Sequence, residues 1–304
     1  MGTENLSNKQ HSSYALITAA RNEEDYIANC MDSVVGQRVK PDYWVIVSDG
    51  SVDRTEEIVR DYARLNGWIH LVRKEPAPSQ VGFSSKVFAL KKGIEQLNHR
   101  RFDYIGHLDA DITLLPNYYS IILDEFERNP RLGIGGGYIL ESTSGEFRSR
   151  KANSPWSVAG GIQFFRYECY QDIGELIPMP HGGEDWYAEI MARMHHWEVK
   201  AFPAVPAFHH KPSAMRRGVI KEAKRLGEMD YSLGTHPLFE IVKCLRRIKL
   251  KPYGVFAAVR LFSFCKLLIE RCPRVVNRDV ALFLRREQLL RLKQFAMGLK
   301  MRDL

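Results

Sequence analysis

The segment Tyr104-Ile105-Gly106-His107-Leu108-Asp109-Ala110-Asp111 decides the predicted fold of this chain. An apolar run ends here in the carboxylates of Asp109 and Asp111, and Pro116 then turns the chain. Residues two apart on a strand project to the same side, so both carboxylates leave a buried strand together. Such a pair suits Mg²⁺ or Mn²⁺, which also takes oxygen ligands from substrate phosphates. Taken alone, the same pattern also fits a solvated turn.

Strand and helix patterns alternate on the N-terminal side of this segment. Buried strands are predicted at 14–20, 43–48, 69–73 and 104–109, and helices at 23–37, 53–66 and 84–98. Asn22 and Asp53 are the expected caps of the first two helices. Short connections between alternating strands and helices imply right-handed crossovers and a mainly parallel α/β sheet flanked by helices.

Polar residues end three of the predicted strands. In sheets of this kind, ligands bind at the carboxyl ends of the strands. Thr18, Asp49 and the pair Asp109/Asp111 should therefore meet at one edge. Asp49 is followed by Gly50, which permits an unusual turn, and its carboxylate can accept hydrogen bonds from a base N–H or a ribose hydroxyl. The turn after Thr18 either lines a nucleotide or only caps a helix.

The alternation stops after Leu132. Glycine-rich strands are expected at 133–138 and 159–165, closely approached by other backbone or by a ligand. The polar, basic stretch 142–154 is expected to be a mobile loop and, with 215–218, a candidate lid. A helix is predicted at 183–197 and a strand at 199–210.

Four further groups of residues have side chains that could bind a ligand or take part in a reaction. Lys86, near a helix start, can meet phosphate or base, or be an ordinary surface lysine. Glu184 and Asp185 open a helix, where one can serve as a general base or both can simply favour the helix dipole. A histidine at 209 or 210, but not both, can complete a metal site with Asp111. Trp156 and Trp186 offer flat faces for a sugar ring.

The length and composition of the chain limit the classes of protein to which it can belong. The 304 residues, 45% apolar and 26% charged, are enough for one large domain or a domain with an appendage. The five cysteines are scattered, with no Cys-x-x-Cys pair, which predicts a reducing compartment without a disulfide framework. We expect no signal sequence at the polar N-terminus and no transmembrane helix.

The charge is divided unevenly along the chain. Residues 211–304 hold 22 Lys+Arg against 8 Asp+Glu, whereas the remainder holds 22 against 28. A basic region of this kind suggests anionic lipid, nucleic acid or an acidic substrate. Within it, 254–269 is apolar except for a polar arc that includes Arg260, Ser263 and Lys266. This helix either lies on an anionic membrane or packs on the catalytic body or on a second subunit. Nucleic acid is disfavoured, because the basic residues lack interleaved aromatic residues.

Together these motifs, in this order and spacing, resemble the family 2 glycosyltransferases of GT-A fold. The resemblance covers roughly residues 12–212 and is carried by TAARNEE at 18–24, VSDGSVDRT at 47–55, Lys86/Ala89/Gly93, LDAD at 108–111, AGG at 159–161 and GED at 183–185. It implies that Asp49 binds a nucleotide base, Asp109 contacts ribose or sugar, and Asp111 holds the metal. It also implies Asp185 as the catalytic base, with Glu184 orienting the acceptor. The donor-binding residues it predicts are Thr18, Arg21, Glu23, Asp49, Lys86, Asp109, Ala110 and Gly161.

The resulting hypothesis is an inverting glycosyltransferase that uses Mn²⁺ or Mg²⁺ on Asp111, with His209 or Asp109 as further candidate ligands. It would move one sugar from a UDP- or GDP-linked donor to a glycan or lipid-linked hydroxyl in cell-surface polysaccharide synthesis. The Gln-x-x-Arg-Trp signature of processive synthases is absent, which favours single transfer. The expected divisions are a flexible 1–12, a catalytic 13–212, and a basic, helical 213–304, with the cytoplasmic face of a membrane as the expected location. The rivals are a catalytically silent membrane-associated scaffold and a sugar-phosphate nucleotidyltransferase.

Overall fold

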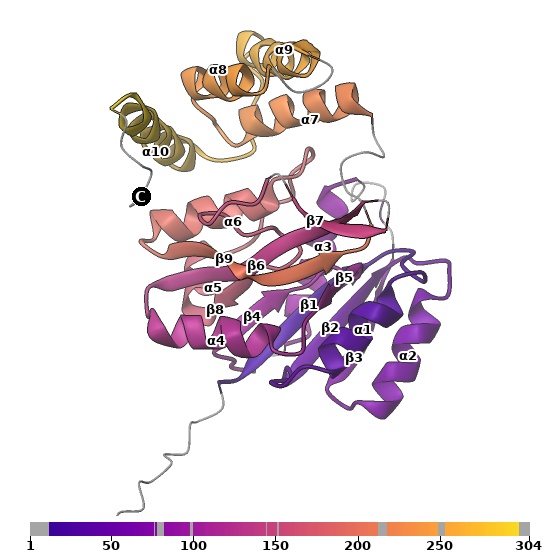
Figure 1. Ribbon diagram of the computed structural model, residues 1–304. Coiled ribbons are helices and arrows are strands. Elements are labelled where there is room, and N and C mark those ends of the chain that lie inside the picture. Colours follow the sequence, from indigo (N-terminus) through magenta and orange to yellow (C-terminus); the bar gives the residue numbers. More distant parts are fainter. Residues whose placement is uncertain are drawn as a thin grey trace, which may run out of the picture.

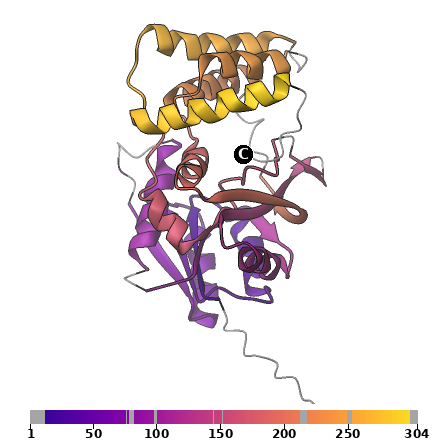
Figure 2. The same cartoon turned by 90° about the vertical axis from the view of Figure 1, so that its left-hand side faces the viewer.

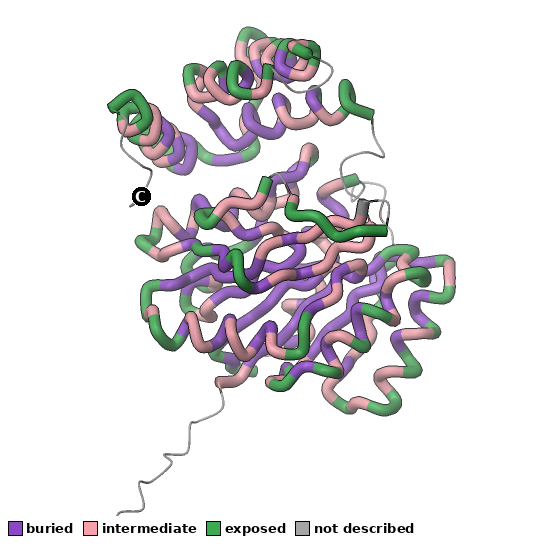
Figure 3. The backbone as a smooth tube through the Cα atoms, in the orientation of Figure 1, coloured by how far each residue is buried: buried purple, intermediate pink, exposed green. Residues whose placement is uncertain are grey.

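The computed structural model describes residues 12–75, 77, 82–97, 100–143, 145–150, 152–211, 218–248 and 253–297. One mixed sheet, flanked by helices, forms the body of the molecule, and a separate layer of helices lies over one side of it (Figure 1). The buried residues run through the sheet and the inner faces of the helices (Figure 3). The expected flexible N-terminus at 1–12 and the candidate lid at 215–218 fall almost entirely outside the described residues.

The N-terminal half has the predicted parallel topology. Its strands are β1 (Tyr14–Ala20), β2 (Tyr43–Asp49), β3 (Ile69–Lys74) and β4 (Tyr104–His107), ordered β3-β2-β1-β4 and all parallel. The connecting helices are α1 (Ile27–Val35), α2 (Thr55–Leu65) and α3 (Ser84–Glu95). Nearly every side chain of β1 and β2 is buried, as expected for parallel strands covered on both faces.

The prediction that Asn22 caps the first helix is wrong. Helix α1 begins four residues later than predicted, after Tyr26. Asn22 instead adopts a left-handed conformation, with φ of 54°, and its Oδ1 accepts a hydrogen bond from Val52 N at 3.0 Å. The residue links two loops rather than starting a helix. Asp53 does precede α2, and its carboxylate accepts from Thr55 N at 3.0 Å.

The C-terminal half of the sheet is mixed. The remaining elements of the body are β5 (Ile112–Leu114), α4 (Tyr118–Arg128), β6 (Leu132–Thr143), β7 (Glu146–Ser149), β8 (Phe164–Arg166), α5 (Tyr167–Ile173), α6 (Glu184–Met194) and β9 (Glu198–His209). The sheet continues β4-β8-β6-β9-β5, with β8 antiparallel to both neighbours and β9 parallel to β6. This arrangement places the end of β9, at His209, beside Asp109 and Asp111.

Two expectations for this half are corrected. Much of 142–154 is not a mobile loop, because β7 pairs with the end of β6 as a hairpin. The segment 159–165 is a strand only at its end, since β8 begins at Phe164 and residues 160–162 form a turn. The expected close approach to 133–138 is confirmed. A Cβ on Gly133 would lie 2.5 Å from Cys169 Sγ, and one on Gly137 would overlap the carbonyl oxygen of Val205.

The basic C-terminal region is a packed layer of helices. It contains α7 (Val219–Ser232), α8 (Pro237–Arg246), α9 (Val255–Ile269) and α10 (Arg278–Ala296), stacked above α6 (Figure 2). A second hydrophobic core joins this layer to the body. Tyr187 and Ile190 of α6 share that core with Met229 and Leu233 of α7 and Leu284 of α10. No described helix is long and apolar enough to cross a membrane.

Helix α9 buries Arg260 and Ser263 of its polar arc, whereas Lys266 stays exposed. Arg260 is only 1% exposed, and its guanidinium bonds Glu240 at 2.6 Å and also pairs with Asp230. Lys243 Nζ lies 2.7 Å from both oxygens of Asp230, which completes a buried ionic cluster between α7, α8 and α9. This face of 254–269 therefore packs against α7 and α8 of the helical layer, and not directly on the catalytic body as the packing alternative expected. An interfacial helix with Arg260 in water is ruled out.

The buried cluster predicts a stability asymmetry along α9. Replacing Arg260 by Ala leaves Glu240 and Asp230 buried with reduced compensation, and should lower the free energy of unfolding by about 3–5 kcal/mol. Replacing exposed Lys266 by Ala on the same helix should change it by no more than about 0.5 kcal/mol. Urea unfolding of both variants tests this, and equal losses would contradict it.

Candidate functional site

A cleft of about 290 Å³ lies at the carboxyl ends of the central strands. The residues that line it include Lys86, Asp109, Gly161, Glu184, Asp185 and His209, which come from widely separated parts of the sequence. The structure thus brings half of the predicted site residues, six of twelve, into the lining of one cleft. The position agrees with the rule that ligands bind at the carboxyl edge of such sheets.

Asp109 and Lys86 form the central ion pair of the cleft. Lys86 Nζ lies 2.6 Å from Asp109 Oδ1. Burial alone would lower the pKa of Lys86, but Asp109, Glu184 and Asp185 raise it. Burial alone would raise the pKa of Asp109, and Lys86 holds it below its ordinary value. Lys86 therefore stays cationic and Asp109 anionic, and this lysine is not the ordinary surface residue of the alternative interpretation.

Gly161 is required by the position of Asp109. A Cβ on Gly161 would lie 2.5 Å from Asp109 Oδ2, and the Gly161 carbonyl accepts a hydrogen bond from Asp109 N at 3.0 Å. The turn at 160–162 therefore packs directly on the carboxylate. Ala110, between the two aspartates, is buried.

Asp111 and His209 lie side by side at the junction of β5 and β9. His209 Nε2 is 3.2 Å from Asp111 Oδ2. Burial alone would lower the pKa of His209, but its hydrogen bond with Asp111 raises it overall. The His210 side chain instead lies 2.8 Å from Thr113 Oγ1, and its backbone N–H donates to the Asp111 carbonyl at 3.0 Å, so of the two imidazoles only that of His209 bonds the Asp111 carboxylate.

Glu23 adds a further carboxylate near this pair. Its Oε1 accepts from Lys211 Nζ at 2.7 Å, whereas its Oε2 is buried without a partner in the described part of the chain. Burial raises the pKa of Glu23, and the nearby carboxylates of Asp111 and Asp109 raise it further, against the opposing effect of Lys211. The site therefore contains an uncompensated oxygen that a cation or a donor hydroxyl can satisfy.

Asp49 is held rigidly at the end of β2. Lys74 Nζ lies 2.7 Å from its Oδ1, and Ser85 Oγ hydrogen-bonds its Oδ2. A carboxylate has about four lone-pair positions, so these contacts leave room for a base N–H.

Thr18 is a correction to the predicted donor-binding set. Its side chain is fully buried, and its Oγ1 accepts from the indole Nε1 of Trp44 at 3.0 Å. Thr18 therefore anchors the core of the sheet and does not face a ligand. Arg21, by contrast, is exposed in the turn after β1.

The turns after β1 and β2 are tied to each other. Asn22 N donates to Ser51 Oγ at 3.2 Å, Glu23 N donates to Thr55 Oγ1 at 2.8 Å, and Glu24 N donates to Asp53 Oδ2 at 3.1 Å. These bonds fix the position of Glu23 relative to Asp49. The motifs 18–24 and 47–55 thus act as one unit, which their separate interpretations did not predict.

Asp185 opens α6 over the cleft. Gly182 and Gly183, with φ of 76° and 101°, make the turn that precedes the helix. Asp185 Oδ2 accepts from Gly160 N at 3.2 Å and Oδ1 from Trp186 N at 2.9 Å. Burial and the neighbouring Asp185 raise the pKa of Glu184. Asp185 is thus oriented by the backbone, at the edge of the cleft that contains Lys86.

The sequence did not indicate that the C-terminal layer lines the cleft. Arg225 of α7 donates to the His181 carbonyl at 2.6 Å, and its guanidinium lies 4.8 Å from the Phe83 ring centre. Arg225 and its neighbour Glu222 both line the cleft. No spacing signal marks these residues, because their role depends on how α7 packs over 181–185.

Helix α6 also carries a deeply buried carboxylate. Glu189 Oε1 accepts from Val158 N at 2.7 Å and from Ser157 Oγ at 3.0 Å. Burial raises the pKa of Glu189 to about 8, although Arg193 opposes the shift. It holds the segment 157–158 against the helix that bears Asp185.

A mixed α/β sheet with an acidic cleft at its carboxyl edge defines the class of GT-A glycosyltransferases. The chain belongs to glycosyl transferase family 2, whose sequence profile matches residues 15–187. It is therefore a family 2 glycosyltransferase. The predicted fold and enzyme class are confirmed.

Curated relatives match only part of their own length. Uncharacterized glycosyltransferase EpsJ of Bacillus subtilis is 29% identical over 129 residues, which cover 42% of this chain and 35% of that protein. The poly-beta-1,6-N-acetyl-D-glucosamine synthase of Staphylococcus epidermidis is 26% identical over 159 residues, or 52% and 34% of the two chains. The chain thus matches about a third of the length of each of these relatives.

Solved structures share the fold across nearly the whole chain. A mannosyltransferase, PcManGT from Pyrobaculum calidifontis in complex with GDP-Man and Mn²⁺, has a TM-score of 0.55 at 16% identity, with 95% of this chain and 84% of that chain covered. S. aureus TarS 1-349 in complex with UDP-GlcNAc has a TM-score of 0.53 at 11% identity, with 95% and 93% covered. The similarity includes most of the C-terminal helical layer.

The buried state of Glu189 predicts a pH dependence of stability. The pKa rises from 4.5 to about 8 on folding, so the fold favours the neutral acid. The stability linked to this group is complete below pH 4.5 and is lost as pH rises towards 8. In that window, wild type should lose up to about 1.4 kcal/mol per pH unit relative to Glu189→Gln. Urea unfolding across pH measures the difference, and parallel curves would contradict it.

Proposed function

We propose that the protein transfers a single sugar from a nucleoside diphosphate sugar to an acceptor hydroxyl, with inversion and with Asp185 as the general base. The observation that carries this proposal is the position of Asp185, oriented by two backbone N–H groups at the rim of the cleft that holds Lys86 and Asp109. An acceptor hydroxyl attacks poorly until a positioned carboxylate takes its proton. Inversion at the anomeric carbon follows if one hydroxyl attacks opposite the leaving diphosphate.

Donor recognition would be shared among the strand ends. Asp49 would bind the base, Asp109 the ribose or sugar, and Lys86 the phosphate side, with Arg21 and Glu23 at the adjoining turn. PcManGT and TarS are solved with GDP-Man and UDP-GlcNAc, which supports a GDP- or UDP-linked donor. Within the cleft, Glu184 would orient the acceptor beside Asp185.

The residues at the cleft fit a divalent cation. Asp111 and His209 present an oxygen and a nitrogen 3.2 Å apart, and the buried Oε2 of Glu23 lacks a partner among the described residues. The described part of the chain contains no cluster of three or more His, Cys, Asp or Glu residues that could hold a metal ion by itself. A bound Mn²⁺ or Mg²⁺ would therefore take further ligands from the donor phosphates. When bound, the cation would stabilise charge on the leaving diphosphate. Asp109 is the weaker candidate ligand, because its Oδ1 already pairs with Lys86.

The outer face of the helical layer supports a membrane-proximal site of action. Phe262 and Ile269 of α9 are 70% and 79% exposed, opposite the buried Arg260. Exposed apolar residues also line α8, namely Leu238, Ile241 and Leu245. Lys266 and the exposed Arg271 lie close in sequence to Phe262 and Ile269 of α9.

We propose that this face contacts anionic lipid, and that a glycan or lipid-linked acceptor is elongated there for polysaccharide synthesis. The five free cysteines support the cytoplasmic face.

A paired substitution tests the catalytic proposal. Asp185→Asn should lower transfer by at least ~100-fold while donor binding stays within about twofold, because only proton removal is lost. Asp111→Asn should weaken Mn²⁺-dependent binding of UDP- or GDP-sugars, measured by calorimetry. The matched control is Glu168→Gln, an exposed first-turn acid of α5 away from the cleft.

Each outcome decides between the interpretations. If Asp185→Asn behaves like Glu168→Gln, the carboxylate only favours its helix dipole and the catalytic role is wrong. If wild type binds donors but turns over none with any acceptor, the silent scaffold is correct. Formation of a nucleotide sugar from a sugar phosphate and a nucleoside triphosphate would instead support the nucleotidyltransferase.

The membrane proposal predicts a face-specific loss of binding. Phe262→Ser with Ile269→Ser should reduce co-sedimentation with phosphatidylcholine vesicles containing about a third phosphatidylserine by roughly tenfold, because both side chains would leave the lipid interface. Leu65→Ser, at an 86% exposed apolar residue of α2, is the control and should change nothing. Equal binding of all variants would overturn the proposal.

A further inference from the structure

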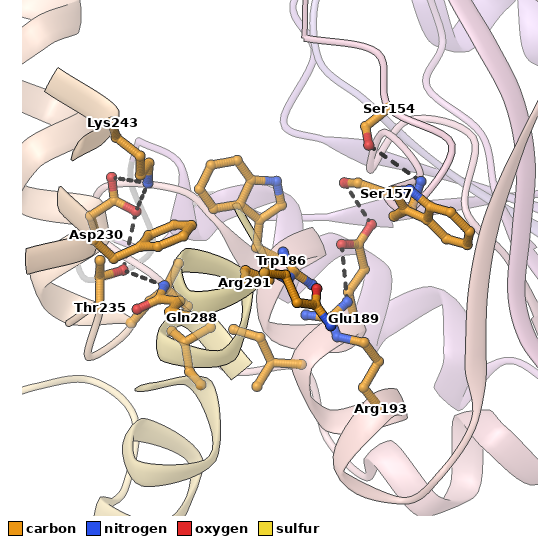
Figure 4. Close-up of a pocket in the computed structure, with 16 residues that line it drawn as sticks. Ser154, Ser157, Trp186, Glu189, Arg193, Asp230, Thr235, Lys243, Gln288 and Arg291 are labelled. Carbon is orange, nitrogen blue, oxygen red and sulfur yellow. Dashed lines mark hydrogen bonds and ion pairs between the residues drawn. The ribbon is translucent and has the colours of Figure 1, made fainter. Parts of the chain in front are cut away.

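A second cavity, of about 220 Å³, lies between the body and the helical layer (Figure 4). One wall is formed by α6 and the segment 154–157, and the other by residues of α7, α8 and α10. Figure 4 shows Trp186 in the middle of this space, with Lys243, Asp230 and Thr235 on one side and Ser154 and Ser157 on the other. We call it the seam cavity.

The lining of the seam cavity combines flat rings with hydrogen-bonding side chains. Trp156 and Trp186 are both part of it. Gln294 and Ser154 add polar side chains to the lining, whereas the amide of buried Gln288 already bonds His236 N and Thr235 Oγ1. A few polar groups set among apolar and aromatic surfaces are typical of small-molecule sites, and sugars present both a face and hydroxyls.

The charges of the cavity leave one cation without a partner. Lys243 is neutralised by Asp230 at 2.7 Å, and Arg193 by Glu287 at 2.9 Å. Arg291 of α10 lines the same cavity but makes no hydrogen bond or ion pair within the described part of the chain. Burial and the neighbouring Arg193 lower the pKa of Arg291, and the carboxylates of Glu287 and Glu189 oppose this shift without an ion pair to Arg291 among the described residues.

The seam cavity is adjacent to the proposed catalytic base. Asp185 faces the donor cleft, whereas Trp186, Glu189 and Arg193 of the same helix line the seam cavity. The segment 154–161 also lines both cavities, because residues within 154–157 line the seam cavity and residues 159–161 line the donor cleft. Helix α6 and the segment 154–161 therefore form a wall that the seam cavity shares with the cleft containing Asp185.

We propose that the seam cavity binds the acceptor, and that this acceptor is a saccharide with one negatively charged group, which pairs with Arg291. The rings of Trp156 and Trp186 would contact its sugars. The anion is either a uronate carboxylate or a phosphate, since a guanidinium binds both through two parallel hydrogen bonds. This assignment rests on the proposed function, because only a transferase needs an acceptor beside Asp185.

Three soluble saccharides separate the possibilities. The probes are neutral chitotetraose, chitotetraose 1-phosphate and a tetrasaccharide of alternating N-acetylglucosamine and glucuronate, with binding followed by tryptophan fluorescence and calorimetry. Wild type should bind at least one charged probe roughly tenfold or more tighter than the neutral one. Whichever charged probe binds tighter identifies the anion. Equal binding of all three, or none, would overturn the proposal.

Substitutions locate the effect. Arg291→Gln should abolish the preference for charge, leave donor binding unchanged, and leave the melting temperature equal or higher, because an unpaired buried cation is removed. Arg286→Gln, an exposed arginine on the same helix, should match wild type. A preference that survives Arg291→Gln, or unfolding of that variant, would contradict the assignment.

Failure here is distinguishable from failure of the proposed function. If the charged probe binds through Arg291 but receives no sugar, while another acceptor does, then the seam cavity is not the acceptor site and the transferase remains. If no acceptor receives sugar although the probe binds, the proposed transfer function itself is wrong, and the acceptor assignment fails with it.

Discussion

The mutual repulsion of carboxylates around one cleft is the constraint on which this structure depends. Burial and the nearby Asp111 and Asp109 raise the pKa of Glu23, and burial together with Asp185 and Asp109 raises the pKa of Glu184. The protein compensates with single cations placed on individual acids. Lys86 pairs with Asp109 and Lys211 with Glu23, while the imidazole of His209 hydrogen-bonds Asp111. The buried Oε2 of Glu23 has no partner among the described residues, and the cation proposed near Asp111 would supply one.

Local patterns predicted the parallel half of the fold because each strand there is buried on both faces and each connection is short. Tyr14–Ala20, Tyr43–Asp49 and Tyr104–His107 could be recognised as apolar runs, and their topology alone placed Asp49 and Asp109 at one edge. The strands of the mixed half were harder to predict from the sequence. The hairpin of β6 and β7 lies in a polar stretch whose exposed residues carry no periodic apolar signal. Asn22 has the residue type of a helix cap, and only its bond to Val52 shows why it is not one.

The candidate site was predictable where a side chain follows directly from a strand or helix end, and not where packing decides. Thr18 occupies such an end, yet the alternation of side chains places its hydroxyl against Trp44 within the core. Arg225 has no sequence signal, because it reaches the cleft only through the position of α7 over Gly182. The same is true of α9. Its composition showed one polar face but not whether that face meets water, and the buried partners Asp230 and Glu240 lie on other helices.

Helix α6 links the two halves of the molecule. Asp185, in its first turn, lines the donor cleft, whereas Glu189 and Arg193, on the two following turns, line the seam cavity. Tyr187 and Ile190 pack against the helical layer. Any displacement of the layer would therefore shift the base relative to Lys86 and Asp109. The ionic cluster around Arg260 fixes α7, α8 and α9 as a unit, and α7 in turn holds the 181–183 turn through Arg225. The C-terminal region is thus part of the architecture of both cavities, because α7 contributes to one wall of the cleft and the helical layer closes the other side of the seam cavity.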